Sequence, residues 1–160
     1  MNSDIIPTDT AVVHTTVGNP TGVHPTAVHT TLIPVAVYGT LKRGLSNHYV
    51  IQDAQFLGID CLHVITVYDL GPYPGAKMEA SGGIDIEVYA VNDIQLQALD
   101  LLEEYNGDAP EQGMYSRLLL DTRFGPAWVY IYNHNVEGMA VLRQGTWLPA
   151  QAQALQAKPE

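Results

Sequence analysis

The sequence predicts an α+β fold, built on a small mixed β-sheet that is closed or nearly closed and carries a few helices. Two observations favour this class. Most segments after residue 32 are short, rich in β-branched and aromatic residues, and separated by Gly, Pro, Asn or Asp, which is typical of strands and turns. A single segment, Asp93 to Tyr105, has the apolar spacing and the end signals of a confident helix.

The first half of this region contains four elements. Ile33 to Tyr38 is an apolar run that predicts the first strand, and Leu45 to Asp53 is expected to form a short helix. Phe56 to Leu70 is long enough for two strands or one bent strand. Apolar and polar residues then alternate from Gly83 to Ala90, as in a strand with one buried face.

The second half begins with the helix. Asn92 is a favourable N-cap, and Gln95 stands three residues later, as in a capping box. Tyr115 to Thr122 and Ala127 to Tyr132 are predicted to be two strands of a hairpin, joined by the turn 123–126.

The chain is predicted to contain one domain, residues 33–148, between a flexible arm (residues 1–32) and a tail (residues 149–160). The arm is rich in Thr, Val, Pro and His and buries too little apolar area to offset the cost of ordering. Its histidines, His14, His24 and His29, could bind a metal weakly, but no Cys or paired carboxylate completes a ligand set. No metal is therefore expected.

Composition excludes several classes of function. The formal charge of −10 and only 7 Lys and Arg argue against nucleic acid and anionic membranes as partners. Cys61 is the single cysteine, and no signal-peptide pattern or membrane-spanning apolar run is present. The expected location is the cytoplasm and the expected partner is a small molecule.

The segment Val37 to Gly44 is the most informative part of the chain. A strand breaks at Gly39, and the residues after it have no regular period, so their N–H groups can turn toward one point and hold an anion. The two glycines have the spacing of a P-loop. That motif requires Lys-Ser/Thr after the second glycine, whereas this chain has Leu45-Ser46. A small carboxylate is therefore a better ligand than a nucleotide.

Two adjacent glutamates at the end of the helix are expected to face different surroundings. On a helical wheel, Ile94, Leu99 and Leu101 belong to a broad apolar arc, and Asp100 and Glu104 lie on the polar side. Glu103 falls at the edge of the apolar arc. Partial burial would raise the pKa of its carboxyl and permit proton exchange near neutral pH. From the wheel alone, an ordinary boundary glutamate near a helix end is the favoured interpretation of Glu103.

Four motifs in order resemble the gamma-glutamylcyclotransferase-like family, in its gamma-glutamylamine cyclotransferase (avirulence-induced-gene-like) branch. The match covers residues 33–148. The motifs are the Tyr-Gly-Thr-Leu segment 38–41, the Tyr-Pro loop 72–75, the Leu-Asp-x-x-Glu element 99–103 and the Tyr-x-Arg strand 115–117.

The resemblance implies a compact α+β barrel with the active pocket at one mouth. It implies a cofactor-independent enzyme that releases 5-oxoproline and an amine or amino acid from a small gamma-glutamyl substrate. Glu103 would be the general acid and base. The substrate-binding residues would be Tyr38, Gly39, Thr40, Leu41 and Tyr115.

Other readings stay open. The same fold could sense a small carboxylate metabolite without turning it over. The family often has glycine after the acid, where this chain has Glu104, which puts substrate choice in doubt. Arg117 is expected to pair with Asp100, while Lys42 and Arg43 are expected to be solvated. The leaving amine and the oligomeric state do not follow from the sequence.

Overall fold

The computed structural model describes residues 30–150 and residue 153. One α-helix, α1 (Asp93–Leu102), and two 3-10 helices, η1 (His48–Val50) and η2 (Pro110–Gln112), occur in this part of the chain together with eight strands. The strands are β1 (Ile33–Val37), β2 (Gln55–Leu62), β3 (Thr66–Asp69), β4 (Pro74–Lys77), β5 (Ile84–Val91), β6 (Tyr115–Thr122), β7 (Gly125–Tyr132) and β8 (Ala140–Leu142).

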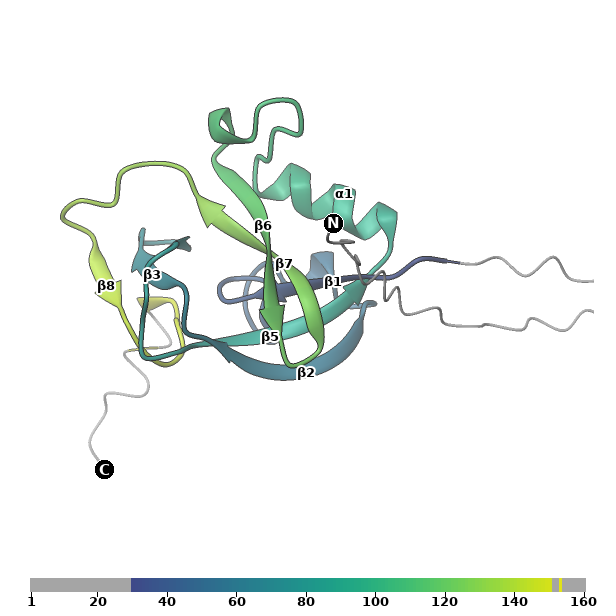
Figure 1. Cartoon of the computed structure of the whole chain (residues 1–160), viewed down its shortest axis with the longest axis horizontal. Coiled ribbons are helices and arrows are strands. Elements are labelled where there is room, and N and C mark those ends of the chain that lie inside the picture. Colours follow the sequence, from purple (N-terminus) through teal and green to yellow (C-terminus); the bar gives the residue numbers. More distant parts are fainter. Residues whose placement is uncertain (1–29, 151–152, 154–160) are drawn as a thin grey trace, which may run out of the picture.

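The strands form two sheets (Figure 1). The larger has five strands in the order β2-β5-β1-β7-β6, and the smaller has three in the order β4-β3-β8. All neighbours are antiparallel except β1 and β7, which run parallel and pair at Val35 and Trp128. The prediction of a mixed α+β fold is confirmed, with β1 at the centre of the larger sheet.

The closed barrel, one of the two forms that the sequence predicted, is not formed. The edge strands β2 and β6 share no hydrogen-bonded ladder in the described chain. Their contact is made instead by the β6–β7 turn, where the Arg123 N–H donates to the Asp60 carboxylate at 2.8 Å. The Phe124 ring also covers Gly58, leaving no room for a Cβ there. These two contacts of the turn therefore take the place of strand pairing, and the sheet is not closed by hydrogen bonds.

Other predicted elements are confirmed or corrected. The hairpin of β6 and β7 is present with a two-residue turn, Arg123-Phe124, because β7 begins at Gly125. The stretch 56–70 divides into β2 and β3. The helix expected over 45–53 is wrong, because only the three residues of η1 are helical. Strands β4 and β8 were not expected from the sequence.

Helix α1 begins with the predicted capping box: the Asn92 side chain accepts from the Gln95 N–H at 2.8 Å, and the Gln95 side chain accepts from the Asn92 N–H at 2.9 Å. The helix ends at Leu102, three residues earlier than expected. It buries Leu96 and Leu99, whereas Ile94 and Leu101, which the wheel placed in the apolar arc, are exposed.

The core has two clusters that lie against opposite faces of the larger sheet. One contains Ile84, Ile86 and Val88 of β5 with residues of β3, β4 and β7. The other contains Val35, Val37 and Tyr89 with the buried face of α1. Because side chains alternate between the two faces of β5, this strand contributes residues to both clusters. The cluster with Val35, Val37 and Tyr89 packs the C-terminal end of α1 beside the end of β1.

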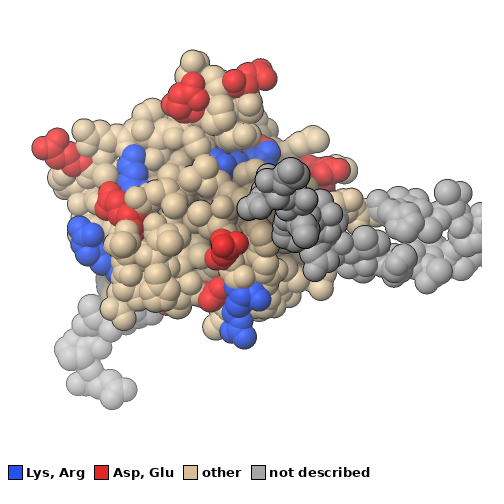
Figure 2. Space-filling view, viewed as in Figure 1, with Lys and Arg blue, Asp and Glu red and all other residues tan. Residues whose placement is uncertain are grey.

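Several expectations concern parts outside the described residues: the arm to residue 29, with its three histidines, and most of the tail. Within residues 30–150, no helix has the length and hydropathy to span a bilayer. Figure 2 shows Lys and Arg interspersed with Asp and Glu on the visible face. Cys61 is exposed.

Candidate active site

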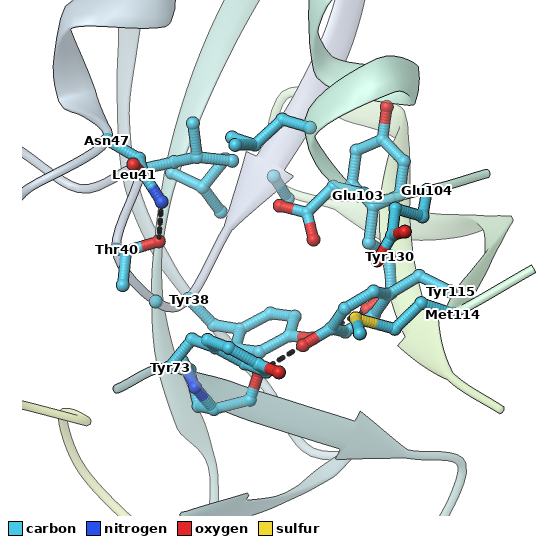
Figure 3. A pocket seen from close by; sticks show the side chains of 15 residues that line it. Tyr38, Thr40, Leu41, Asn47, Tyr73, Glu103, Glu104, Met114, Tyr115 and Tyr130 are labelled. Carbon is cyan, nitrogen blue, oxygen red and sulfur yellow. Dashed lines mark hydrogen bonds between the residues drawn. The ribbon is translucent and has the colours of Figure 1, made fainter. Parts of the chain in front are cut away.

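A cavity of about 230 Å³ opens where β1 ends and α1 ends (Figure 3). Its walls come from the loop after β1, the Tyr73-Pro74 segment, the end of α1, the start of β6, and β7. The lining residues are Ala36, Val37, Tyr38, Gly39, Thr40, Leu41, Asn47, Tyr73, Pro74, Leu102, Glu103, Glu104, Met114, Tyr115 and Tyr130. All six candidate site residues from the sequence therefore line one cavity.

The loop Gly39-Thr40-Leu41 forms one wall. Side chains of the following turn fix its shape: Asn47 Nδ2 donates to Thr40 Oγ1 at 2.9 Å, and His48 Nδ1 lies 2.9 Å from the Leu41 carbonyl oxygen. The N–H groups of the three loop residues have no acceptor among the described residues. Buried N–H groups of this kind hold an anion well, because it supplies the missing partners.

Residue 39 must be glycine because no space is left for a side chain, and not because of its backbone angle. A Cβ built there would lie 2.6 Å from Cγ and 2.8 Å from Cδ of Pro74, both far inside contact distance. The loop therefore lies directly against the ring of Pro74. Any side chain at residue 39 would force the two walls of the cavity apart.

Glu103 faces this loop across the cavity (Figure 3). It is the C-cap of α1, and its N–H donates to the Leu99 carbonyl at 2.9 Å. Among the described residues, its carboxylate has no hydrogen-bond or ion-pair partner. Burial raises the pKa of this carboxyl from 4.5 to about 7, because the charged form loses water without gaining a compensating donor. Such a group can take up and release a proton near neutral pH.

The turn after Glu103 is a Schellman motif. The N–H of Tyr105 donates to the Asp100 carbonyl at 2.9 Å, and that of Glu104 donates to the Leu101 carbonyl at 3.3 Å. Glu104 has a φ of 50°, in the left-handed region where glycine is the usual residue. Met114 N–H then donates to the Glu104 carbonyl at 3.0 Å, which joins this turn to the start of β6.

Three of the four tyrosines that line the cavity, Tyr38, Tyr115 and Tyr130, use their hydroxyls within the protein. Tyr38 donates to the Tyr130 carbonyl at 2.7 Å and accepts from the Ala76 N–H at 3.1 Å. Tyr115 donates to the Pro74 carbonyl at 2.8 Å. Burial raises the pKa of Tyr38, Tyr115 and Tyr130 above the usual range of a phenol, so all three stay neutral. Their rings line the cavity, and the hydrogen bonds of their hydroxyls connect the segments that form its walls.

An ion pair fixes α1 against the sheet, three residues before Glu103. Arg117 Nε lies 3.1 Å from Asp100 Oδ1, as the sequence predicted, and the same oxygen accepts from the Tyr130 hydroxyl at 2.7 Å. These contacts join α1 to β6 and β7. Asp100 is therefore turned inward, although the wheel placed it on the polar side.

Of the two basic residues after the loop, Lys42 is not solvated, contrary to expectation, whereas Arg43 is exposed, as expected. Lys42 is buried, and its Nζ donates to the Trp147 carbonyl at 2.8 Å. The Arg43 guanidinium lies 3.6 Å from the centre of the Phe56 ring. In the described chain, no cluster of three His, Cys, Asp or Glu side chains is placed to bind a metal. The expectation that no metal is used stays a prediction.

Sequence reasoning missed parts of the cavity wall. It gave no role in the wall to Met114, Asn47 or Tyr130, although Tyr130 both packs in the core and lines the cavity. The Asn47-His48 pair was visible directly after the loop. A polar pair at that spacing, with donors free to bond back to loop carbonyls and hydroxyls, was the available signal.

A family model for gamma-glutamyl cyclotransferase, AIG2-like, matches residues 35–149. The chain belongs to this family. It is 34% identical to the gamma-glutamylcyclotransferase family protein YtfP of Escherichia coli K12 over 71% of this chain and 95% of that protein. It is 31% identical to the gamma-L-glutamyl-butirosin B gamma-glutamyl cyclotransferase of Niallia circulans, over 62% and 66% of the two chains. The family resemblance seen in the sequence is confirmed.

Solved structures agree on the fold. The solution structure of YtfP from Escherichia coli has a TM-score of 0.58 at 35% identity and covers 72% of this chain and 96% of its own. An AIG2-like protein of Mus musculus has a TM-score of 0.61 at 23% identity, over 81% and 97% of the two chains. At that identity the second likeness shows the fold alone.

Proposed function

We propose that this family member is a cofactor-independent cyclotransferase that converts a small gamma-glutamyl amide into 5-oxoproline and a free amine or amino acid. The observation that carries the proposal is the position of Glu103. Its carboxyl has a pKa of about 7 and faces unpaired loop N–H groups across one small cavity. The names of the curated relatives support the reaction type.

In the proposed reaction, the N–H groups of Gly39, Thr40 and Leu41 hold the α-carboxylate of the substrate or the oxyanion that develops at the γ-carbonyl. Ionised Glu103 takes a proton from the substrate α-ammonium group. The freed amine then attacks the γ-carbonyl carbon, and a new carbon–nitrogen bond closes the five-membered ring. Because the nucleophile belongs to the substrate, the protein need not supply a Ser or Cys.

Glu103 next gives its proton to the leaving nitrogen, and the old amide bond breaks. This transfer returns Glu103 to its ionised form. The ring nitrogen then loses its second proton to solvent, and the released amine takes a proton up from solvent. A carboxyl with a pKa near 7 is suited to both transfers, because neither protonation state is strongly favoured at neutral pH. The cavity supplies proximity by holding the substrate in a folded conformation.

The proposal is tested by incubating the protein with a panel of gamma-glutamyl amines and dipeptides and measuring 5-oxoproline. Release from at least one substrate, lost in Glu103→Gln, supports it. Tight binding of panel members without any 5-oxoproline would instead indicate a sensing module on the same fold. We further propose that the protein acts in the cytoplasm on a small-molecule substrate, without nucleic-acid or membrane partners.

A further inference from the structure

We infer that Glu104 selects gamma-glutamyl substrates whose leaving amine carries a positive charge beyond the scissile amide. This inference rests on the proposed function and names a substrate class for it. The evidence is the charge of the cavity, the position of Glu104 at its rim, and the backbone that fixes this residue there.

The cavity has an uncompensated negative charge. Of its lining residues, two are carboxylates, Glu103 and Glu104, and none is Lys, Arg or His. Nearby cations in the described chain are occupied elsewhere. Lys42 Nζ donates to the Trp147 carbonyl, and Arg117 pairs with Asp100. A cationic ligand group therefore meets attraction in this cavity, and an anionic group meets repulsion away from the loop N–H groups.

The two ends of the cavity differ in depth. Thr40 and Leu41, whose N–H groups suit the substrate carboxylate, are buried, whereas Glu104 is exposed although it lines the same cavity. In Figure 3, Glu103 lies between the loop and Glu104. A substrate with its carboxylate on the loop and its amide at Glu103 therefore directs its leaving group toward Glu104.

The backbone holds Glu104 in a conformation that glycine would adopt more easily. Its φ of 50° is fixed from one side by the Schellman hydrogen bonds and from the other by the Met114 N–H. Gly113 packs so closely that a Cβ there would lie 2.4 Å from the Glu104 carbonyl oxygen. A charged side chain at a position suited to glycine is unfavourable for folding, which points to a role in the site.

The inference is tested with three probes of equal reach: gamma-L-glutamyl-1,4-diaminobutane (cationic), gamma-L-glutamyl-pentylamine (neutral) and gamma-L-glutamyl-5-aminopentanoate (anionic). The measured quantity is the ratio of kcat/KM for the cationic probe to that for the neutral one. We expect a ratio of about two to five in the wild type, as for an ion pair at a solvent-exposed rim. The anionic probe should be the poorest substrate.

Two variants separate charge from backbone conformation. Glu104→Gln removes the charge and keeps the left-handed strain, while Glu104→Gly removes both; either should bring the ratio to about one, mainly through KM. Glu137→Gln is the control, because Glu137 is exposed, lies away from the cavity and changes the net charge equally. Raising salt from about 0.05 to about 0.5 M should lower the wild-type ratio and leave that of Glu104→Gln unchanged.

The outcomes distinguish the two proposals. If all three probes release 5-oxoproline and Glu104→Gln keeps the wild-type ratio, the charge selection is wrong and the cyclotransferase proposal stands. A fall in kcat alone, equal for all probes, would also overturn charge selection and assign Glu104 a role through Glu103. If the wild type releases 5-oxoproline from no probe and from no member of the wider panel, both proposals fail.

Discussion

The hydroxyl of Tyr115 donates a hydrogen bond of 2.8 Å to the carbonyl oxygen of Pro74, across 41 positions of sequence. This bond ties the start of β6 to β4. Because the Pro74 ring also lies against Gly39, one proline connects the start of β6 with the loop that offers its N–H groups. The separation between the two walls of the cavity depends on this contact.

Tyr115→Phe should lower the free energy of unfolding by about 1–3 kcal/mol, because a buried carbonyl loses its donor while the ring still fills its space. KM for the best substrate should rise more than kcat falls, since Tyr73 and Pro74 line the cavity. Denaturant unfolding and steady-state kinetics measure both effects. Tyr49→Phe, at an exposed position, is the control; equal stability changes in the two variants would contradict this role for Tyr115.

Gly39→Ala should impair substrate binding strongly, because the new methyl group would lie within 2.8 Å of two Pro74 atoms. Separating the walls moves the loop N–H groups from the acid, and misplacement by about 1 Å can cost about 100-fold in rate. Gly107→Ala is the matched control, because the nearest atom to its Cβ would be 3.8 Å away. Kinetics and affinity like those of Gly107→Ala would show that the close approach is unimportant.

The sequence predicts a structural feature well when the residues that form it lie close together in the chain. The capping box and the alternation along β5 involve residues close in sequence, and both are confirmed. Strand β4 begins with Pro74-Gly75, which by composition indicates a turn. It is a strand because β3 pairs with it and Tyr115 binds it, and neither partner can be recognised from the segment itself.

The same limit applies around the site. The wheel placed Glu103 at the boundary of the core because the spacing of Leu96 and Leu99 is local, and the residue is indeed partly buried. It failed for Asp100, whose orientation is set by Arg117 and Tyr130 on other strands. The left-handed conformation of Glu104 was also hidden, because glycine is the residue that normally signals it.

The stability of the protein should depend on pH through Glu103. Its carboxyl has a pKa of about 7 in the folded state and 4.5 as its ordinary value, so the folded state binds more protons between these limits. The free energy of unfolding contributed by this group is therefore present below pH 4.5 and is lost as pH rises through 7.

The side chain in Glu103→Gln stays neutral at every pH, so this variant should not lose stability as the pH rises through 7. It should exceed the wild type in stability by about 3 kcal/mol near pH 8, with little difference near pH 4. Denaturant unfolding of both proteins at the two pH values measures the effect, and Glu137→Gln controls for net charge. A difference between Glu103→Gln and wild type that is equal at both pH values would show that the Glu103 pKa is not raised by folding.

Activity should depend on the ionisation of the same carboxyl, but it should rise with pH where stability falls. In the proposed reaction Glu103 must be ionised to accept the proton of the substrate ammonium group, so kcat/KM should fall below an apparent pKa of about 7. Glu103→Gln should lower kcat by about 10²- to 10⁴-fold and abolish this limb of the profile. Glu104→Gln should retain the limb, because the raised pKa of Glu103 comes from burial. A limb that persists in residual Glu103→Gln activity would assign the proton transfer to another group.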